Sequence, residues 1–171
     1  MSNSSPANVP GYFQLYIDQV NEKDLATAFT SQSTIIKDFL PGISEEKSTY
    51  AYAQGKWTIK ELLQHLIDAE RIFTYRALCF ARKEQVTLPG FEENEYAAAS
   101  NANIRSWESL TAEFVAVRKA TLFLYDSFTA EMLATSGKAS VNTYTVEALG
   151  FILLGHFNHH IKIIKERYIN G

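Results

Sequence analysis

Cysteine, basic charge and long apolar runs are all scarce in this sequence of 171 residues. Cys79 is the single cysteine, so an intrachain disulfide and a cysteine-based zinc site are both excluded. The net charge of −3 with mixed signs argues against nucleic-acid binding, which needs a basic face. The apolar run at 148–155 is too short to cross a membrane. Residues 1–10 lack the basic start and apolar core of a signal peptide, so we expect a flexible N-terminal tail on a cytoplasmic protein.

The sequence also lacks strand-length alternation of apolar and polar residues, and it has no repeat of fixed period. Apolar residues instead recur at helical spacing. The fold class predicted from this pattern is all-α, an up-down four-helix bundle with an extra short N-terminal helix, formed as a single domain by residues 11–171. We expect long helices at 25–39, at 58–82, from about Asn101 or Arg105 to Phe128, and from a cap at Asn142 or Thr143 to about Tyr168.

Shorter features fill the remaining segments. The short N-terminal helix is expected at 12–20, a helical turn at 44–47, and polar loops at 87–96 and 137–143. Asp24 is predicted to cap the helix that follows it. Thr58 and Glu61 have the spacing of a capping box, in which each side chain binds the other residue's backbone N–H.

Three of the four histidines lie in one short stretch, residues 155–160, inside an apolar helical pattern. His156 and His160 are four residues apart, so they share one face of a helix, and that face also carries Ile152 and Ile163. Two imidazoles on the apolar face must be hydrogen-bonded or coordinated when buried. His159 is displaced toward the flank, where it would bind near the site or simply be solvated, although its spacing from His156 also allows it to replace His160.

The remaining histidine, His65, lies near the edge of the apolar stripe of the helix at 58–82. The sharpest hypothesis is that His65, His156 and His160 hold one divalent metal ion and leave a coordination position open. The competing interpretation is that these are ordinary hydrogen-bonded histidines, and one sequence cannot show that the two helices touch. Asp68, one turn beyond His65, is the candidate for orienting His65 or moving protons, although a solvated helix face is the simpler explanation for it. Neither the Glu-x-x-His nor the His-Glu-x-x-His template occurs.

Four stretches carry a family resemblance: residues 55–71 around His65, the histidines of 155–160, and the segments 88–91 and 107–118. The first resembles the second-helix signature of DinB-like proteins, the second resembles their fourth-helix motif, and the last two resemble one subgroup of that family. The resemblance implies a bundle of DinB/YfiT type, often a homodimer, with a divalent metal on His65, His156 and His160. Related bundles include thiol-dependent S-transferases, a thiol-dependent isomerase and proteins described as metal-dependent hydrolases.

From this resemblance we expect one divalent ion, zinc or nickel first and iron or manganese second. The expected function is a metal-dependent enzyme that activates a thiol or water against a small-molecule substrate, as a transferase or a hydrolase. The alternative is a non-catalytic bundle that uses the metal for stability or sensing, or serves in dimerisation. The sequence at 161–164 departs from the Arg-Gly-Gln type found in many members, so no particular thiol is transferred.

Overall fold

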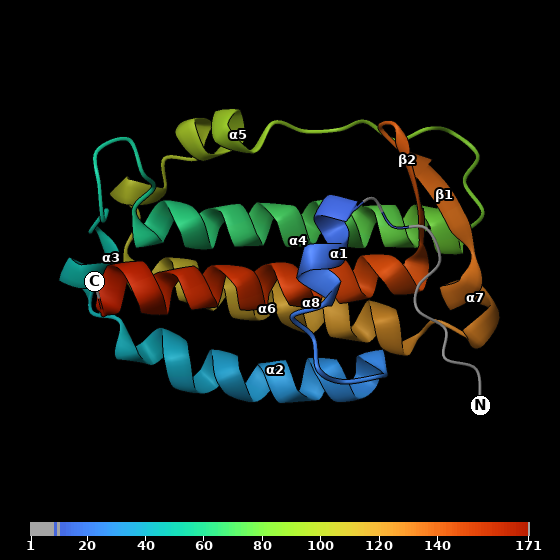
Figure 1. Ribbon diagram of the computed structural model, residues 1–171, viewed down its shortest axis with the longest axis horizontal. Coiled ribbons are helices and arrows are strands. Elements are labelled where there is room, and N and C mark those ends of the chain that lie inside the picture. Colours follow the sequence, from blue (N-terminus) through green and yellow to red (C-terminus); the bar gives the residue numbers. More distant parts are fainter. Residues whose placement is uncertain (1–8, 10, 171) are drawn as a thin grey trace.

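The computed structural model describes residues 9 and 11–170, so all of the tail expected at 1–10 except Val9 lies outside the described residues. Four long helices lie side by side along the longest axis of the molecule (Figure 1). They are α2 (Leu25–Phe39), α4 (Ile59–Ala81), α6 (Trp107–Asp126) and α8 (Val146–Ile163). The short helices are α1 (Gly11–Ile17), α3 (Glu45–Ser48), α5 (Glu93–Ala99) and α7 (Ala130–Ala134). The predicted all-α four-helix bundle with a short N-terminal helix is therefore confirmed.

Two of the long helices depart from strict up-down order. Arg71 of α4 pairs with Glu113 of α6, and farther along both helices Thr74 meets Thr121, so α4 and α6 run in the same direction. The direction alternates between α2 and α4 and between α6 and α8 (Figure 1). The exception arises because the connection at 82–106 returns along the whole bundle before α6 begins.

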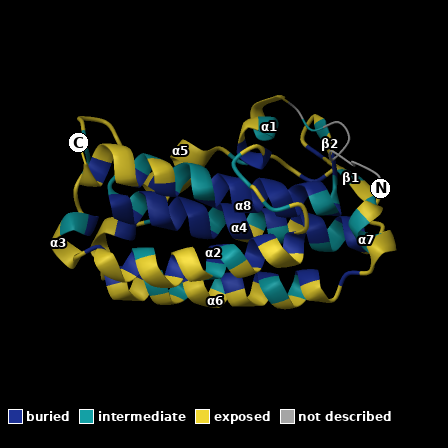
Figure 2. Ribbon diagram, turned by 60° about the horizontal axis from the view of Figure 1, so that its bottom comes forward, coloured by how far each residue is buried: buried dark blue, intermediate teal, exposed yellow. Residues whose placement is uncertain are grey.

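α8 is the central helix of the bundle. It packs against α1, α2 and α4, and every residue at 148–157 is buried. Figure 2 shows α8 mostly buried, whereas α2 and α6 expose one face to solvent. A helix that is apolar all round belongs in a core, which explains its high apolar content. None of the helices in the described part of the chain is both long and apolar enough to cross a bilayer.

The predicted caps of α2 and α4 are present. Asp24 accepts a hydrogen bond of 2.9 Å from the Thr27 backbone N–H. The Thr58 hydroxyl accepts from the Glu61 backbone N–H at 3.1 Å, while the Glu61 carboxylate accepts from the Thr58 N–H at 2.8 Å. Both helices begin where these side chains satisfy backbone donors that have no partner within the helix.

The loop predicted at 87–96 is shorter than expected, because α5 begins at Glu93 and is followed by a 3₁₀ turn, Ala102–Ile104. α5 has only seven residues, too few to produce a clear apolar stripe. α6 begins at Trp107, with Ser106 as its cap, and not as early as Asn101. The prediction of Asn101 fails because that residue has a left-handed backbone, with φ of 53°, at the start of the 3₁₀ turn.

The polar connection predicted at 137–143 is a short β-hairpin. Strands β1 (Ser136–Ala139) and β2 (Asn142–Thr145) pair antiparallel, and Ser140 turns between them with φ of 53°. The strands have four residues each, so their alternation was too brief to detect. Thr145 caps α8 by accepting from the Ala148 backbone N–H. The predicted caps Asn142 and Thr143 are wrong because both residues belong to β2.

The end of α8 also differs from the prediction. The α-helical hydrogen bonding stops at Ile163, and residues Ile164–Ile169 continue as a π-helical segment. Helical structure therefore continues to about Tyr168, as expected, but the last turns are π-helical and wider than α-helical turns.

A buried polar network joins all four long helices. Arg118 of α6 donates two hydrogen bonds of 2.8 Å to the carboxylate of Glu70 on α4, and both side chains are at least 96% buried. Arg118 also donates to Gln32 of α2, whose own amide donates to the Leu154 carbonyl and the Asn158 side chain of α8. Buried charge is tolerated here because each group has partners.

α1 lies directly on α8 at a glycine. A Cβ atom placed on Gly155 would lie 1.9 Å from the backbone oxygen of Tyr16. Only glycine permits this approach of two helix backbones. The contact seats Tyr16 beside the histidine stretch of α8.

Candidate metal centre

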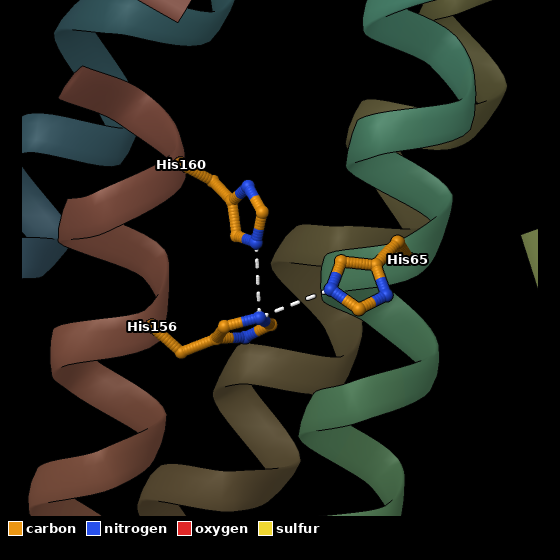
Figure 3. A group of neighbouring side chains, drawn as sticks. All are labelled: His65, His156 and His160. Atoms are coloured by element: carbon orange, nitrogen blue, oxygen red, sulfur yellow. Dashed lines mark hydrogen bonds between the residues drawn. The ribbon is translucent and has the colours of Figure 1, made fainter. Parts of the chain in front are cut away.

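Three histidines from two antiparallel helices meet inside the bundle. α4 carries His65, and α8 carries His156 and His160 on the side that faces it. Figure 3 shows the three rings pointing toward one another between the two helices. The Nε2 atom of His156 lies 3.0 Å from the Nε2 atoms of both His65 and His160. The structure thus supplies the contact between helices that one sequence could not show.

The spacing of the three nitrogens fits a metal ion. Zinc binds imidazole nitrogen at about 2.0–2.1 Å in tetrahedral geometry, which separates two such ligands by about 3.3 Å. Nδ1 of His160 is buried and has no hydrogen-bond partner in the described part of the chain. A proton on Nδ1 leaves Nε2 as a lone pair aimed at the other two rings. Three neutral imidazoles form a donor set suited to late divalent ions.

The surroundings hold all three imidazoles in the neutral form. Burial lowers the pKa of His65 to about 4. Burial, followed by the neighbouring histidines, lowers the pKa values of His156 and His160 well below the ordinary value. A protonated imidazole cannot coordinate a metal, so these shifts keep the ligands available at neutral pH.

A cavity of about 340 Å³ opens on one side of the triad, and His65 and His156 form part of its wall. Three segments complete the wall: α1 with Tyr12, Phe13 and Tyr16, α4 with Ala69, Phe73 and Arg76, and the entry to α5 with Phe91, Glu92 and Glu93. The Tyr16 and Phe73 rings stand edge-on to the His156 ring, with centroids 5.2 and 6.1 Å away. The triad therefore has open space on this side, bounded by aromatic and charged groups.

A second cavity, of about 230 Å³, lies on the His160 side of the triad. Trp57, Leu62, Asn94 and Tyr168 are among its lining residues. The Trp57 ring also packs on His65, with centroids 4.9 Å apart. α5 contributes to both cavities, so this short helix lies over the triad and borders both routes to it.

Glu93 is an acidic group in the larger cavity. Glu93 is exposed at the edge of the cavity, where partial desolvation, and then the charge of Glu92, raises its pKa. Burial raises the pKa of Tyr16 most strongly, followed by Tyr12 and then the charge of Glu93, which places this carboxylate near Tyr16. An exposed carboxylate at the edge of this cavity is able to exchange protons with a molecule bound in it.

The other two residues considered from the sequence lie outside this centre. Asp68 accepts a hydrogen bond of 2.9 Å from Gln64, and burial raises its pKa. Asp68 lines neither cavity beside the triad. Nδ1 of His159 lies 3.4 Å from the Gln19 amide, and its ring packs against Tyr16. His159 therefore flanks the triad without joining it.

The cavity walls include residues that sequence reasoning missed. Glu93 and Arg76 are single charged residues in helices, with no spacing that marks them as partners of the histidines. Tyr16 belongs to a short helix, and the sequence alone does not show where that helix packs. The signal that identifies them is spatial, because each shares a cavity with His65 and His156.

Comparisons with known proteins agree with this architecture. The family model of the DinB superfamily matches residues 29–164, which include all three histidines. A "Putative metal-dependent hydrolase" of Oceanobacillus iheyensis is 23% identical over 130 residues, covering 75% of each chain. YfiT from Bacillus subtilis, described as "a probable metal-dependent hydrolase with an unusual four-helix bundle topology", superposes with a TM-score of 0.71 at 14% identity. The superposition covers 96% of this chain and 91% of YfiT. The chain belongs to the DinB superfamily.

Proposed function

We propose that this protein is a metal-dependent hydrolase that binds one divalent ion through His65, His156 and His160. The observation that carries the proposal is the convergence of three imidazole nitrogens beside a cavity large enough for a small substrate. Three protein ligands leave a coordination position for water or substrate, the pattern of catalytic zinc sites. The names given to the two relatives support the same class of reaction.

The residues around the triad have distinct roles in this proposal. A bound divalent ion would lower the pKa of water and polarise a carbonyl group. The three imidazoles would hold that ion without bringing negative charge to it. Glu93 would accept a proton from the attacking water, because its carboxylate lines the same cavity as His65 and His156. Phe73 and Tyr16 exclude bulk water from the side of the cavity nearest His156.

Metal content of protein purified without a histidine tag tests the ligand set. Zinc and nickel are the expected ions, with iron and manganese as alternatives. We expect about one ion per chain in the wild type and a large loss on alanine substitution of any one of His65, His156 and His160. His159→Ala is the matched control, because it removes a neighbouring histidine that flanks the triad. Full metal content in all three triad variants would refute the proposed site.

Turnover of small esters and amides tests the reaction. Hydrolysis should disappear after chelation and return when metal is added. Glu93→Gln should lower kcat while leaving metal content intact, because it removes a proton acceptor but no ligand. Conjugation of a low-molecular-weight thiol without hydrolysis would instead assign the protein to the transferases.

A non-catalytic metal-stabilised bundle predicts a different result. Chelation would then lower thermal stability strongly, and neither the ester nor the thiol panel would show turnover. The homodimer and the cytoplasmic location also stay predictions. Light scattering after size-exclusion chromatography would test the first, and cell fractionation would test the second.

A further inference from the structure

Arg76 is a buried cation in the wall of the larger cavity. Its side chain is only 6% exposed, and its guanidinium donates one hydrogen bond, of 2.9 Å, to the Pro89 carbonyl. The guanidinium also lies near the faces of Phe73 and Phe91, 5.9 and 6.0 Å from their ring centroids. A guanidinium has five N–H donors, so most of its hydrogen-bonding capacity is unused by these contacts.

The other buried arginine shows what is missing at Arg76. Arg118 is equally buried, and its charge is matched by two hydrogen bonds to Glu70. No carboxylate lies within ion-pair distance of Arg76 among the residues that the structure describes. Glu92 and Glu93 line the same cavity but form no ion pair with it. Burial of a cation without a partner is costly, so an anion bound next to Arg76 would stabilise the site.

Arg76 and His65 lie on the same helix and line the same cavity. Arg76 follows His65 by eleven residues on α4, which corresponds to about 16 Å along the helix axis. Side chains on a helix tilt toward its N-terminus, so the guanidinium reaches back toward His65. An anionic group bound there would share its cavity with His65 and His156.

We infer that Arg76 binds a carboxylate or phosphate group of the substrate, whose reactive bond then reaches the histidine triad. This inference rests on the proposed function, because the bound anion is part of a substrate only if the triad is a hydrolytic site. The planar guanidinium favours flat oxyanions that accept two parallel hydrogen bonds. The preferred substrates are therefore small anionic esters or amides.

Titration of the full-length protein with simple anions after removal of metal tests the subsite directly. The probes are glutarate for a carboxylate, methyl phosphate for a phosphate, and glutaramide as the uncharged counterpart of glutarate. NMR follows the side-chain Nε–Hε signal of Arg76 and the rings of Phe73 and Phe91. We expect at least one anion to bind and to shift the Arg76 signal, while glutaramide leaves it in place.

Three variants complete the experiment. Arg76→Gln should weaken anion binding at least about tenfold, and Arg76→Lys should retain part of it because the charge remains. Arg82→Gln, at the exposed end of α4, is the control for loss of one positive charge and should bind as the wild type does. The inference is overturned if neither anion moves the Arg76 signal of the wild type, or if glutaramide binds as well as glutarate. Equal binding by Arg76→Gln and the wild type would overturn it too.

The two proposals fail separately. The titration needs no metal and no turnover, so the anion subsite can be absent from a protein that still hydrolyses neutral esters. Once an ester is found, Arg76→Gln should raise KM for its anionic form and leave KM for a neutral analogue unchanged. A variant that merely disturbed the fold would change both.

Discussion

The buried pair of Glu70 and Arg118 gives the sharpest prediction about stability. Among the described residues, Glu70→Ala leaves the Arg118 charge in the core with one hydrogen-bonding side chain, Gln32, and with the rings of three phenylalanines. Removal of one member of a buried ion pair costs about 3–5 kcal/mol. A domain of this kind has a free energy of unfolding of about 5–15 kcal/mol, so a single carboxylate accounts for a large share of it.

Urea denaturation followed by circular dichroism measures this effect. The midpoint should fall sharply for Glu70→Ala, with little change in the slope of the transition. The double variant Glu70→Leu with Arg118→Met should recover most of the loss, because it removes both charges and fills the space with apolar atoms. The exposed pair of Lys83 and Glu131 is the control, and Lys83→Ala should have almost no effect.

Two results would refute this reasoning. A loss below about 1 kcal/mol for Glu70→Ala would mean that the Arg118 charge is solvated or finds another partner. A double variant no more stable than Glu70→Ala would mean that shape, and not the unpaired charge, sets the cost.

Three further predictions concern other parts of the fold. Gly155→Ala should cost about 1–3 kcal/mol and speed hydrogen exchange in α1, because the new methyl group would displace the Tyr16 backbone; unchanged exchange in α1 would contradict it. Thr58→Ala should lower the free energy of unfolding by about 1 kcal/mol, measured in urea, while Thr58→Ser should be nearly neutral. For metal-free protein, stability should fall as the pH drops from 7 to 5, because His65 has a pKa of about 4 when folded and about 6.5 when unfolded. The unfolded chain then binds more protons than the folded chain, which lowers the free energy of unfolding by about 2 kcal/mol at pH 5. His65→Leu should reduce this dependence on pH.

The long helices could be predicted from the sequence because their patterns are local. The capping box of Thr58 and Glu61 fixed the start of α4, and Asp24 did the same for α2. The β-hairpin could not be found in the same way. Its strands have four residues, and part of its stability comes from Leu88, which bonds to both Lys138 and Ser140 from far along the chain. The parallel course of α4 and α6 is likewise a property of how the connection at 82–106 packs.

In the candidate site, too, some residues could be predicted from local sequence and others are identified only by the fold. The spacing of His156 and His160 is readable on one helix, and resemblance to a family supplied His65. Arg76 was not recognised because a charged residue in a helix ordinarily faces solvent, whereas Glu93 is an exposed residue that no sequence spacing relates to the histidines. Only the fold shows that both line the cavity beside His65. Asp68 is close to His65 in sequence, but its side chain accepts a hydrogen bond from Gln64 and lines neither cavity beside the triad, so its role in proton transfer stays a prediction.

The docking of α1 at Gly155 adds a wall to the cavity from outside the stretch that matches the DinB family. The stretch that matches the DinB family, residues 29–164, contains the three histidines, whereas α1 lies before it. Substitutions in α1 can therefore reshape the cavity, and with it the range of molecules admitted, without altering the histidines. Gly155 must be retained for such changes, because a helix packed at this position brings its backbone against α8. Libraries that vary Tyr12, Phe13 and Tyr16 while retaining Gly155 are thus a direct route to altered selectivity.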